Sequence, residues 1–172
     1  MIGVETDTLD ITGSITNRKD YSHVKLSDID DVIKKHFTGD ILQIPPMYSA
    51  LKAKGKRLYD LAREGITIDR PPRSVTIYSI HRPIPIPNNP AINLPEFELD
   101  VRCSGGCYIR SLIADIAEKL DSKACMTALE RTKQGPFELK DCVYPDMWSD
   151  YQYMCEHILS QEQLADQLNK LT

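Results

Sequence analysis

The chain of 172 residues is long enough for one domain with a substantial hydrophobic core. Hydrophobic residues make up 41% and charged residues 27%, which is ordinary for a globular protein, and a net charge of −4 does not by itself indicate a nucleic-acid-binding protein. No apolar run approaches the roughly 20 residues of a membrane span. The first residues have neither the basic stretch nor the apolar core of a signal peptide, so we expect an intracellular protein, with its compartment left open.

The predicted elements of the first seventy residues are, in order, a strand end (1–5), a polar turn into a second short strand (6–14), a helix (27–37), extended chain (44–52) and a short helix (57–65). Ser27 is a good N-cap for the first helix, and Gly39 is a good residue to end it. The proline pair of IPPMYSALK favours extended chain, and Gly55 marks a turn.

The predicted elements of the remainder are a strand (71–82), a proline-rich loop (83–95), a strand (97–102), a long helix (109–120), a second helix (125–133), a short strand (135–139) and a C-terminal helix (151–171). Val75 and Ile77 alternate with polar residues, as on a strand with one buried face. The two strands on either side of the proline-rich loop predict a hairpin. Together these elements predict an α+β fold with a mixed, largely antiparallel sheet flanked by helices.

The five cysteines, an odd number, indicate reduced thiols rather than a disulfide framework. Three residues separate Cys103 from Cys107, but no second pair of cysteines or histidines follows at the spacing of a zinc site, so we expect no metal. A cysteine at a helix start can be an activated nucleophile. No histidine lies near Cys107 in the sequence, and we interpret this residue as a core thiol.

The long helix begins with an unusual stretch, CSGGCYIRSLIADIAEKL, at residues 103–120. Its apolar residues recur with helical spacing and define one buried face. Arg110 follows the first of them, Ile109, and therefore lies about 100° round the helix, on the border of the apolar stripe. An arginine in this position either extends its guanidinium to water or is held inward by a buried anion.

Positive charge is concentrated in one region of this acidic chain. Residues 51–75 contain seven basic side chains and three acidic ones. A local basic stripe of this kind can follow a phosphate backbone, but it is equally typical of a solvated helix face. Charge alone leaves both interpretations open.

Five stretches carry a more specific signal: IGVETDTLDITG (2–13), IPPMYSALKAKGKRLYDLAREG (44–65), RPPRSVTIYSI (70–80), CSGGCYIRSLIADIAEKL (103–120) and LERTKQGPF (129–137). In this order and at these spacings they closely resemble the TruB-type pseudouridine synthases, which isomerise the uridine of the tRNA T-loop to pseudouridine. The resemblance covers roughly residues 2–145. It implies a pseudouridine-synthase-like fold, the T-arm of tRNA as the partner, a monomer, and a reaction without cofactor or metal.

The resemblance also implies roles for particular residues. In this family the arginine of the G-x-Y-I-R stretch, here Arg110, pairs with the catalytic aspartate, and the tyrosine, here Tyr108, lies near the flipped base. Leu129 matches the leucine that helps to line the uracil pocket. These roles are physically reasonable, because a guanidinium binds a carboxylate with two hydrogen bonds and apolar or aromatic groups suit an unstacked base. Four cations after MYSALK are expected to contact RNA phosphates: Lys52, Lys54, Lys56 and Arg57.

One family element is missing from the chain. Family members carry the catalytic aspartate in a motif that reads approximately G-T-L-D-P, and the 172 residues contain no such motif. Thr8-Leu9-Asp10 copies three of its letters, but no proline follows Asp10. The surroundings of Asp10 match the family's later T-D-T-x-D-x-x-G stretch instead. We therefore expect Asp10 to form turn hydrogen bonds rather than to act in catalysis.

We accordingly expect residues 1–145 to be the C-terminal portion of a catalytic domain that is incomplete at its N-terminus, and residues 146–172 to be a helical extension. Two functions stay open. The first is a tRNA pseudouridine synthase whose chain, as given, is inactive because it lacks the aspartate. The second is a non-catalytic RNA-binding or tRNA-folding protein of the same fold. The guide-RNA-dependent branch of the superfamily fits less well, since MYSALK and LERTKQGPF look more like the stand-alone branch.

Overall fold

The computed structural model describes residues 1–53, 55–83 and 93–169, which form two compact units, Met1–Thr127 and Ala128–Thr172. Lys54 and most of the proline-rich loop predicted over residues 83–95 lie outside the described residues.

The first unit is built on a three-stranded antiparallel sheet with the strand order β3 (Gly39–Gln43), β6 (Arg73–His81) and β7 (Asp100–Cys103). The inward-facing side chains of β6 include Val75 and Ile77, which are both buried as their alternation predicts. β6 and β7 form the predicted hairpin. The predicted α+β fold with an antiparallel sheet flanked by helices is confirmed.

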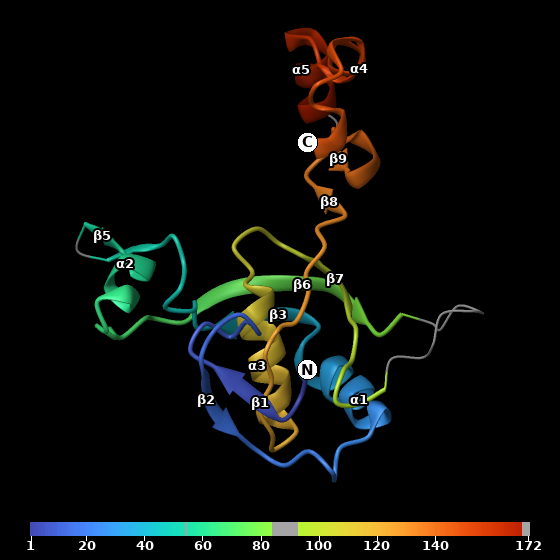
Figure 1. Ribbon diagram of the computed structural model, residues 1–172. Coiled ribbons are helices and arrows are strands. Elements are labelled where there is room, and N and C mark those ends of the chain that lie inside the picture. Colours follow the sequence, from blue (N-terminus) through green and yellow to red (C-terminus); the bar gives the residue numbers. More distant parts are fainter. Residues whose placement is uncertain (54, 84–92, 170–172) are drawn as a thin grey trace. The chain divides into compact units, whose positions relative to one another are not determined.

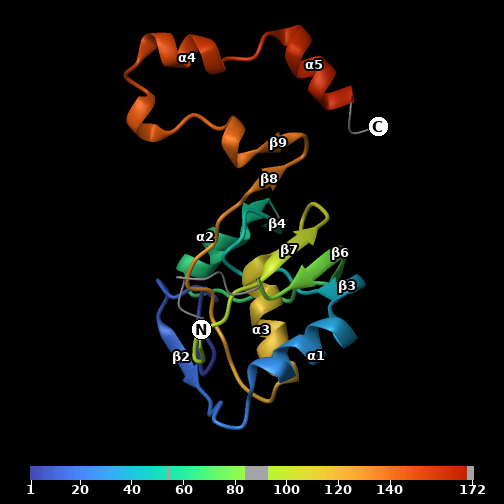
Figure 2. The ribbon, with the colours of Figure 1, turned by 90° about the vertical axis from the view of Figure 1, so that its right-hand side faces the viewer.

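Two helices, α1 (Leu26–His36) and α3 (Ile109–Lys119), cover one face of this sheet, as Figures 1 and 2 show. The predicted apolar stripe of α3 forms the centre of the core, because Leu112 and Ile116 are fully buried. Other buried members of this cluster come from the N-terminus, from the segment before α1, from α1 and its C-cap, from β6 and from the C-cap of α3: Ile2, Val24, Ile29, Ile33, Phe37, Ile77 and Leu120. Burial of this cluster fixes the position of α3, and with it the position of Arg110.

The remaining elements of the first unit are short. They are strands β1 (Val4–Thr6) and β2 (Ile15–Arg18), which pair with each other, strands β4 (Lys52–Ala53) and β5 (Lys56–Arg57), which also pair, and helix α2 (Leu58–Arg63). All these pairs are antiparallel.

The helix predicted over residues 125–133 is wrong. The chain from Ala124 to Thr132 is extended, and its beginning pairs with the N-terminal segment. The N–H of Cys125 donates to the carbonyl of Met1 at 3.1 Å, and the N–H of Met126 donates to the carbonyl of Leu9 at 3.0 Å. These long-range bonds tie the start of the segment to the N-terminal segment, so tertiary pairing overrides local helix propensity.

Two predicted boundaries also shift. Helix α1 begins at Leu26 with Lys25 at the N-cap, and the Asp28 carboxylate accepts the Lys25 N–H at 2.8 Å, so Ser27 is not the cap. The strand predicted over residues 97–102 begins only at Asp100.

The second unit contains the short hairpin β8 (Lys133–Gln134) and β9 (Phe137–Glu138), the 3₁₀ turns η1 (Leu139–Asp141) and η2 (Pro145–Met147), and the helices α4 (Tyr151–His157) and α5 (Gln161–Asn169). The single C-terminal helix predicted over residues 151–171 is thus two helices within the described residues. The break occurs where Ser160 caps α5, since its hydroxyl accepts the Gln163 N–H at 3.2 Å. No helix in the described ranges is long and apolar enough to cross a membrane.

Candidate functional site

Arg110 lies in the first turn of α3 and is held by two backbone carbonyl groups. Its Nη1 donates to the carbonyl of Thr8 at 2.9 Å, and its Nη2 donates to the carbonyl of Tyr48 at 2.8 Å. The guanidinium therefore neither extends freely to water nor pairs with a buried anion, which were the two arrangements predicted from its position. A guanidinium has five N–H donors, so three donors remain beyond these two bonds. Such a group can bind an added carboxylate without releasing its carbonyl partners.

Three stretches that are distant in the sequence meet at Arg110. Thr8 belongs to the turn after β1, Tyr48 to the chain between β3 and β4, and Arg110 to α3. These are the TDTLD, MYSALK and G-x-Y-I-R stretches. Tyr108, two residues before Arg110, is the N-cap of α3 and is half-buried. The structure thus places both predicted active-site residues of this stretch at one helix start.

Asp10 serves the turn that presents the Thr8 carbonyl. Its Oδ1 accepts the N–H of Thr12 at 3.0 Å and the hydroxyl of Thr12 at 2.7 Å. These two bonds, and more weakly the nearby positive charge of Arg110, hold the pKa of Asp10 below its usual value. The expectation that Asp10 forms turn hydrogen bonds is confirmed.

Cys107 lies directly before Tyr108 and is half-buried. Burial, followed by the neighbouring Cys103 thiol, raises the pKa of Cys107 to about 12. The thiol is therefore protonated near neutral pH. This agrees with its interpretation as a core thiol rather than a nucleophile.

Three of the four predicted RNA-contacting cations lie on a small element, residues 52–53 and 55–63, which we call the basic hairpin. Lys52 and Arg57 face each other across β4 and β5, and both are exposed. The Lys56 ammonium is 3.4 Å from the Glu64 carboxylate, so part of its charge is neutralised. Lys54, the fourth predicted cation, lies outside the described residues.

Sequence reasoning missed an aromatic group within the basic hairpin. Two guanidinium groups approach the Tyr59 ring, with the Cζ atoms of Arg57 and Arg63 at 5.6 and 5.3 Å from its centroid, and Arg57 also donates a hydrogen bond to the Tyr59 hydroxyl. Arg57 precedes Tyr59 by two residues and Arg63 follows it by four. This spacing was the sequence signal that could have identified the three residues as a cluster. Guanidinium groups close to an aromatic ring offer charge to a phosphate and planar groups on which a base can stack.

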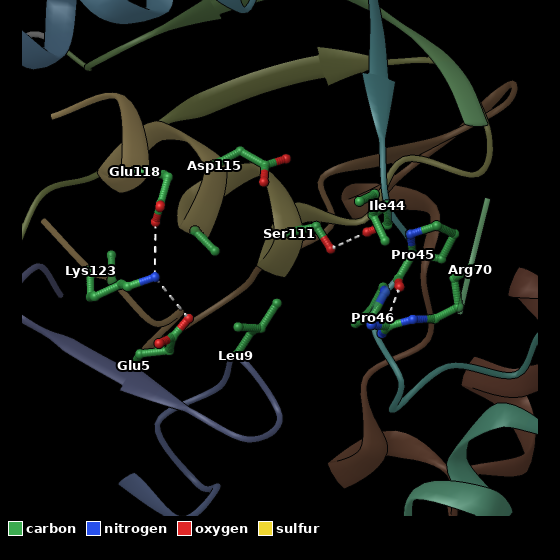
Figure 3. Close-up of a pocket in the computed structure, with 12 residues that line it drawn as sticks. Glu5, Leu9, Ile44, Pro45, Pro46, Arg70, Ser111, Asp115, Glu118 and Lys123 are labelled. Atoms are coloured by element: carbon green, nitrogen blue, oxygen red, sulfur yellow. Dashed lines mark hydrogen bonds and ion pairs between the residues drawn. The ribbon is translucent and has the colours of Figure 1, made fainter. Parts of the chain in front are cut away.

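A pocket of about 350 Å³ opens beside α3 (Figure 3). Ser111 and Asp115 come from α3, and Leu9 and Ile44 come from the chain near the two carbonyl partners of Arg110. On one wall, Lys123 lies between two carboxylates, 2.9 Å from that of Glu118 and 3.5 Å from that of Glu5 (Figure 3). This ion network joins α3 to β1. The network therefore stabilises β1 against α3, and Thr8 lies in the turn that follows β1.

Asp115 is the one group of this pocket with a strongly raised pKa. Burial, and to a lesser degree the negative charge of Glu118, raises the pKa of Asp115 to about 6. Because the folded-state pKa is above the unfolded one, the folded protein binds an extra proton between about pH 4 and 6 and loses stability as pH rises through this range.

We expect Asp115→Asn to stabilise the protein at pH 7.5 by about 1 kcal/mol, a value reduced for the partial solvent exposure of the carboxyl group. The difference from the wild type should disappear below about pH 4, where the aspartate is neutral in both states. Urea unfolding at several pH values measures this, with the exposed Asp31→Asn as the control. A stability difference that does not change with pH would contradict the raised pKa.

Comparison with known proteins adds the decisive observation. The family model "TruB family pseudouridylate synthase (N terminal domain)" matches residues 1–109, and the model "tRNA pseudouridylate synthase B C-terminal domain" matches residues 110–171. The chain belongs to the TruB family of pseudouridylate synthases. The resemblance seen in the five sequence stretches is confirmed.

Individual TruB relatives are similar over nearly the whole chain. The tRNA pseudouridine synthase B of Clostridium perfringens strain SM101 is 44% identical over 171 residues, which is 99% of this chain and 55% of that protein. Human pseudouridylate synthase TRUB1 is 45% identical over 163 residues, which is 92% of this chain and 44% of that protein. The chain thus spans about half the length of the curated relatives that it matches.

Among solved structures, a chain in the crystal structure of a Cbf5-Nop10-Gar1 complex is similar with a TM-score of 0.56 and 27% identity, over 86% of this chain and 36% of that one. This similarity confirms the pseudouridine-synthase-like fold that the TruB resemblance implied.

The last predicted TruB site residue, Leu129, belongs to the second compact unit and not to the unit that holds Arg110 and Tyr108. Within its own unit its side chain is 56% exposed, so it is available for a ligand rather than committed to a core. Its place in a uracil pocket stays a prediction.

Proposed function

We propose that this chain is a C-terminal portion of the catalytic domain of a tRNA pseudouridine synthase that isomerises the uridine of the tRNA T-loop. In this proposal Arg110 pairs with the catalytic aspartate of the G-T-L-D-P motif, Tyr108 lies beside the flipped base, and Leu129 lines the uracil pocket. Residues 1–145 are the part of the catalytic domain that the chain supplies, and residues 146–172 are an extension of it. The names of the TruB relatives support the substrate class.

One observation carries the proposal. Arg110 is fixed at the start of α3 by carbonyl groups from two other family-specific stretches, yet three of its donors remain. A positive charge that is anchored in this way and still able to donate is suited to hold a carboxylate in one orientation. The carboxylate can then be aimed at the substrate without a loss of rotamer freedom at each turnover.

The basic hairpin supports the choice of substrate. Its exposed cations and the Tyr59 ring offer charge for phosphates and a surface for stacking. In the proposal this element follows the backbone of the T-arm, whereas Arg110 and Tyr108 act at the target base.

A direct assay tests the chemistry. We call a protein that carries a G-T-L-D-P segment ahead of Met1, encoded by the same gene or supplied by a family member, the extended form. Isomerisation moves the uracil from a bond at N1 to a bond at C5, so tritium at C5 of the T-loop uridine is released as the product forms. We expect release by the extended form and none by the 172-residue chain, which contains no G-T-L-D-P motif.

The control is the extended form with its motif aspartate replaced by asparagine, which should bind tRNA and release no tritium. Turnover by the purified 172-residue chain would contradict the proposed inactivity and would make Asp10 the first residue to replace. No release by the extended form would contradict the proposed enzyme. The second candidate, a tRNA-binding or tRNA-folding protein, is favoured by the basic hairpin, and it would then be tested by the rate of tRNA annealing with the chain present.

A further inference from the structure

Gln43, the last residue of β3, is a buried polar side chain with no assigned role. It points into the protein from the sheet and is only 2% exposed, at a position where the alternation of β3 calls for an apolar residue. Burying an amide is costly unless its donor and its acceptor are both satisfied. The carbonyl oxygen and one N–H of the Gln43 amide both bond to a single residue.

That residue is Tyr108. The Gln43 Nε2 donates to the carbonyl of Tyr108 at 3.0 Å, and the Gln43 Oε1 accepts the N–H of Tyr108 at 2.8 Å. Like a residue of a neighbouring strand, the Gln43 side chain both donates to and accepts from the backbone of one residue. Two bonds to the same residue fix its orientation as well as its position. We call this pair of bonds the Gln43 clamp.

The Gln43 clamp acts at the origin of α3. Tyr108 is the N-cap, so its N–H has no partner within the helix, and its carbonyl accepts the first helical bond from Leu112 at 3.0 Å. Gln43 therefore satisfies a helix-end donor and shares the first helical acceptor. The direction in which the first turn of α3 leaves the sheet, and hence the direction of Arg110, depends on this contact.

Two further bonds run between the same segments. The Ser111 hydroxyl donates to the carbonyl of Ile44 at 3.1 Å (Figure 3), and Arg110 donates to the carbonyl of Tyr48. The chain from Gln43 to Tyr48 is thus attached to the first turn of α3 at three places. Of these three attachments, only that of Gln43 is made to Tyr108. Because Gln43 is buried, it cannot itself contact a substrate.

We propose that Gln43 is a positioning residue for uridine isomerisation, and that its amide fixes the Tyr108 backbone and thereby the side chains of Tyr108 and Arg110 at the target base. This inference rests on the proposed function. It assigns to a buried strand residue the task of holding two half-buried site residues in position.

The test uses Gln43→Glu, because a carboxyl group has the shape of the amide and matches its hydrogen bonding only when protonated. A neutral carboxylic acid donates one hydrogen bond and accepts another, as the amide does, whereas a carboxylate would repel the Tyr108 carbonyl. Burial raises the pKa of a carboxyl group at this position, so its neutral form is populated in mildly acidic solution.

In the extended form at saturating T-loop RNA, we expect Gln43→Leu to lower kcat for tritium release by about 30- to 100-fold at every pH, with KM within about threefold of wild type. Gln43→Glu should show the same loss at pH 8.5 and recover to within about threefold of wild type at pH 5.5. Leu42→Gln, on the same strand but 72% exposed, is the matched control and should retain wild-type kcat.

A purely structural role would lower the folded fraction, which circular dichroism measures at each pH, and would leave kcat per folded molecule at the wild-type value. A pH-independent ratio of kcat between Gln43→Glu and wild type, or wild-type kcat in Gln43→Leu, would overturn the inference while the proposed function stands.

Hydrogen exchange of the Tyr108 amide in the 172-residue chain separates the two claims further. It should accelerate at least about tenfold in Gln43→Leu and not in Leu42→Gln. If the wild-type extended form releases no tritium, the proposed function fails and the positioning role fails with it, whereas the exchange experiment still shows whether the Gln43 clamp exists.

Discussion

Arg110→Met in the extended form is expected to lower the rate of uridine isomerisation by about 10²- to 10³-fold, with tRNA affinity within about threefold of wild type. The proposed partner of Arg110 is a carboxylate in a site that closes around a flipped base. Removal of the guanidinium leaves that charge without its partner and free to change orientation. The loss therefore falls on the chemical step rather than on tRNA binding, which we propose depends on the basic hairpin.

A second consequence concerns folding. In the 172-residue chain the same substitution leaves the carbonyl groups of Thr8 and Tyr48 without their donor. We expect a loss of about 1–3 kcal/mol in the free energy of unfolding. Arg110→Lys keeps the charge but cannot reach both carbonyl groups as a planar fork does, so it should restore stability and activity only partly.

The matched control is Arg102→Met, at an exposed arginine of β7 whose guanidinium lies 5.8 Å from the Tyr78 ring centroid. It removes the same charge from the same unit and should leave kcat unchanged. Wild-type kcat in Arg110→Met would contradict the proposed role of Arg110. An equal loss in both variants would show that the effect is one of net charge.

The second large effect is expected on tRNA binding. Replacing Lys52, Lys56 and Arg57 together with alanine should weaken binding at least about 10-fold near 100 mM salt and reduce the salt slope, d log K/d log[salt], by about 2 to 3. The expected reduction is below 3 because Lys56 is partly neutralised by Glu64. Titration of labelled T-arm RNA over a series of salt concentrations measures both quantities.

A control with the same change in charge comes from α1 and its N-cap, where Lys25, Lys34 and Lys35 are all exposed. Their replacement by alanine should change the salt slope by less than about 1. If the two triple variants gave the same slope, binding would depend on the overall charge of the protein. The basic hairpin would then have no special part in it.

Local sequence patterns predicted the parts of this fold that are stabilised by burial. The stripe of α3 and the alternation of Val75 and Ile77 led to the correct core because each buried face repeats with the period of its element. Segment 125–133 was predicted wrongly, because its partners are Met1 and Leu9, more than a hundred residues away. Propensity within the segment contains no information about such pairing.

The same distinction holds for the candidate site. Arg110 and Tyr108 could be predicted as site residues from the sequence, since their motif is continuous. The carbonyl partners of Arg110 and the Gln43 clamp could not be predicted, because they join residues 62 to 102 positions apart and involve backbone groups that every residue possesses. A glutamine at the end of a strand is not by itself a signal. Only the structure shows that this amide is buried against the N-cap of α3.

The central claim is that Arg110 is anchored here to hold the aspartate of the G-T-L-D-P motif. A double-mutant cycle in the extended form tests it, with the free energy of unfolding measured for wild type, Arg110→Met, the motif aspartate replaced by alanine, and both changes together. We predict a coupling energy of about 1–3 kcal/mol between the two side chains. Effects that add to within about 0.3 kcal/mol would show that the two groups do not interact, and would contradict the account.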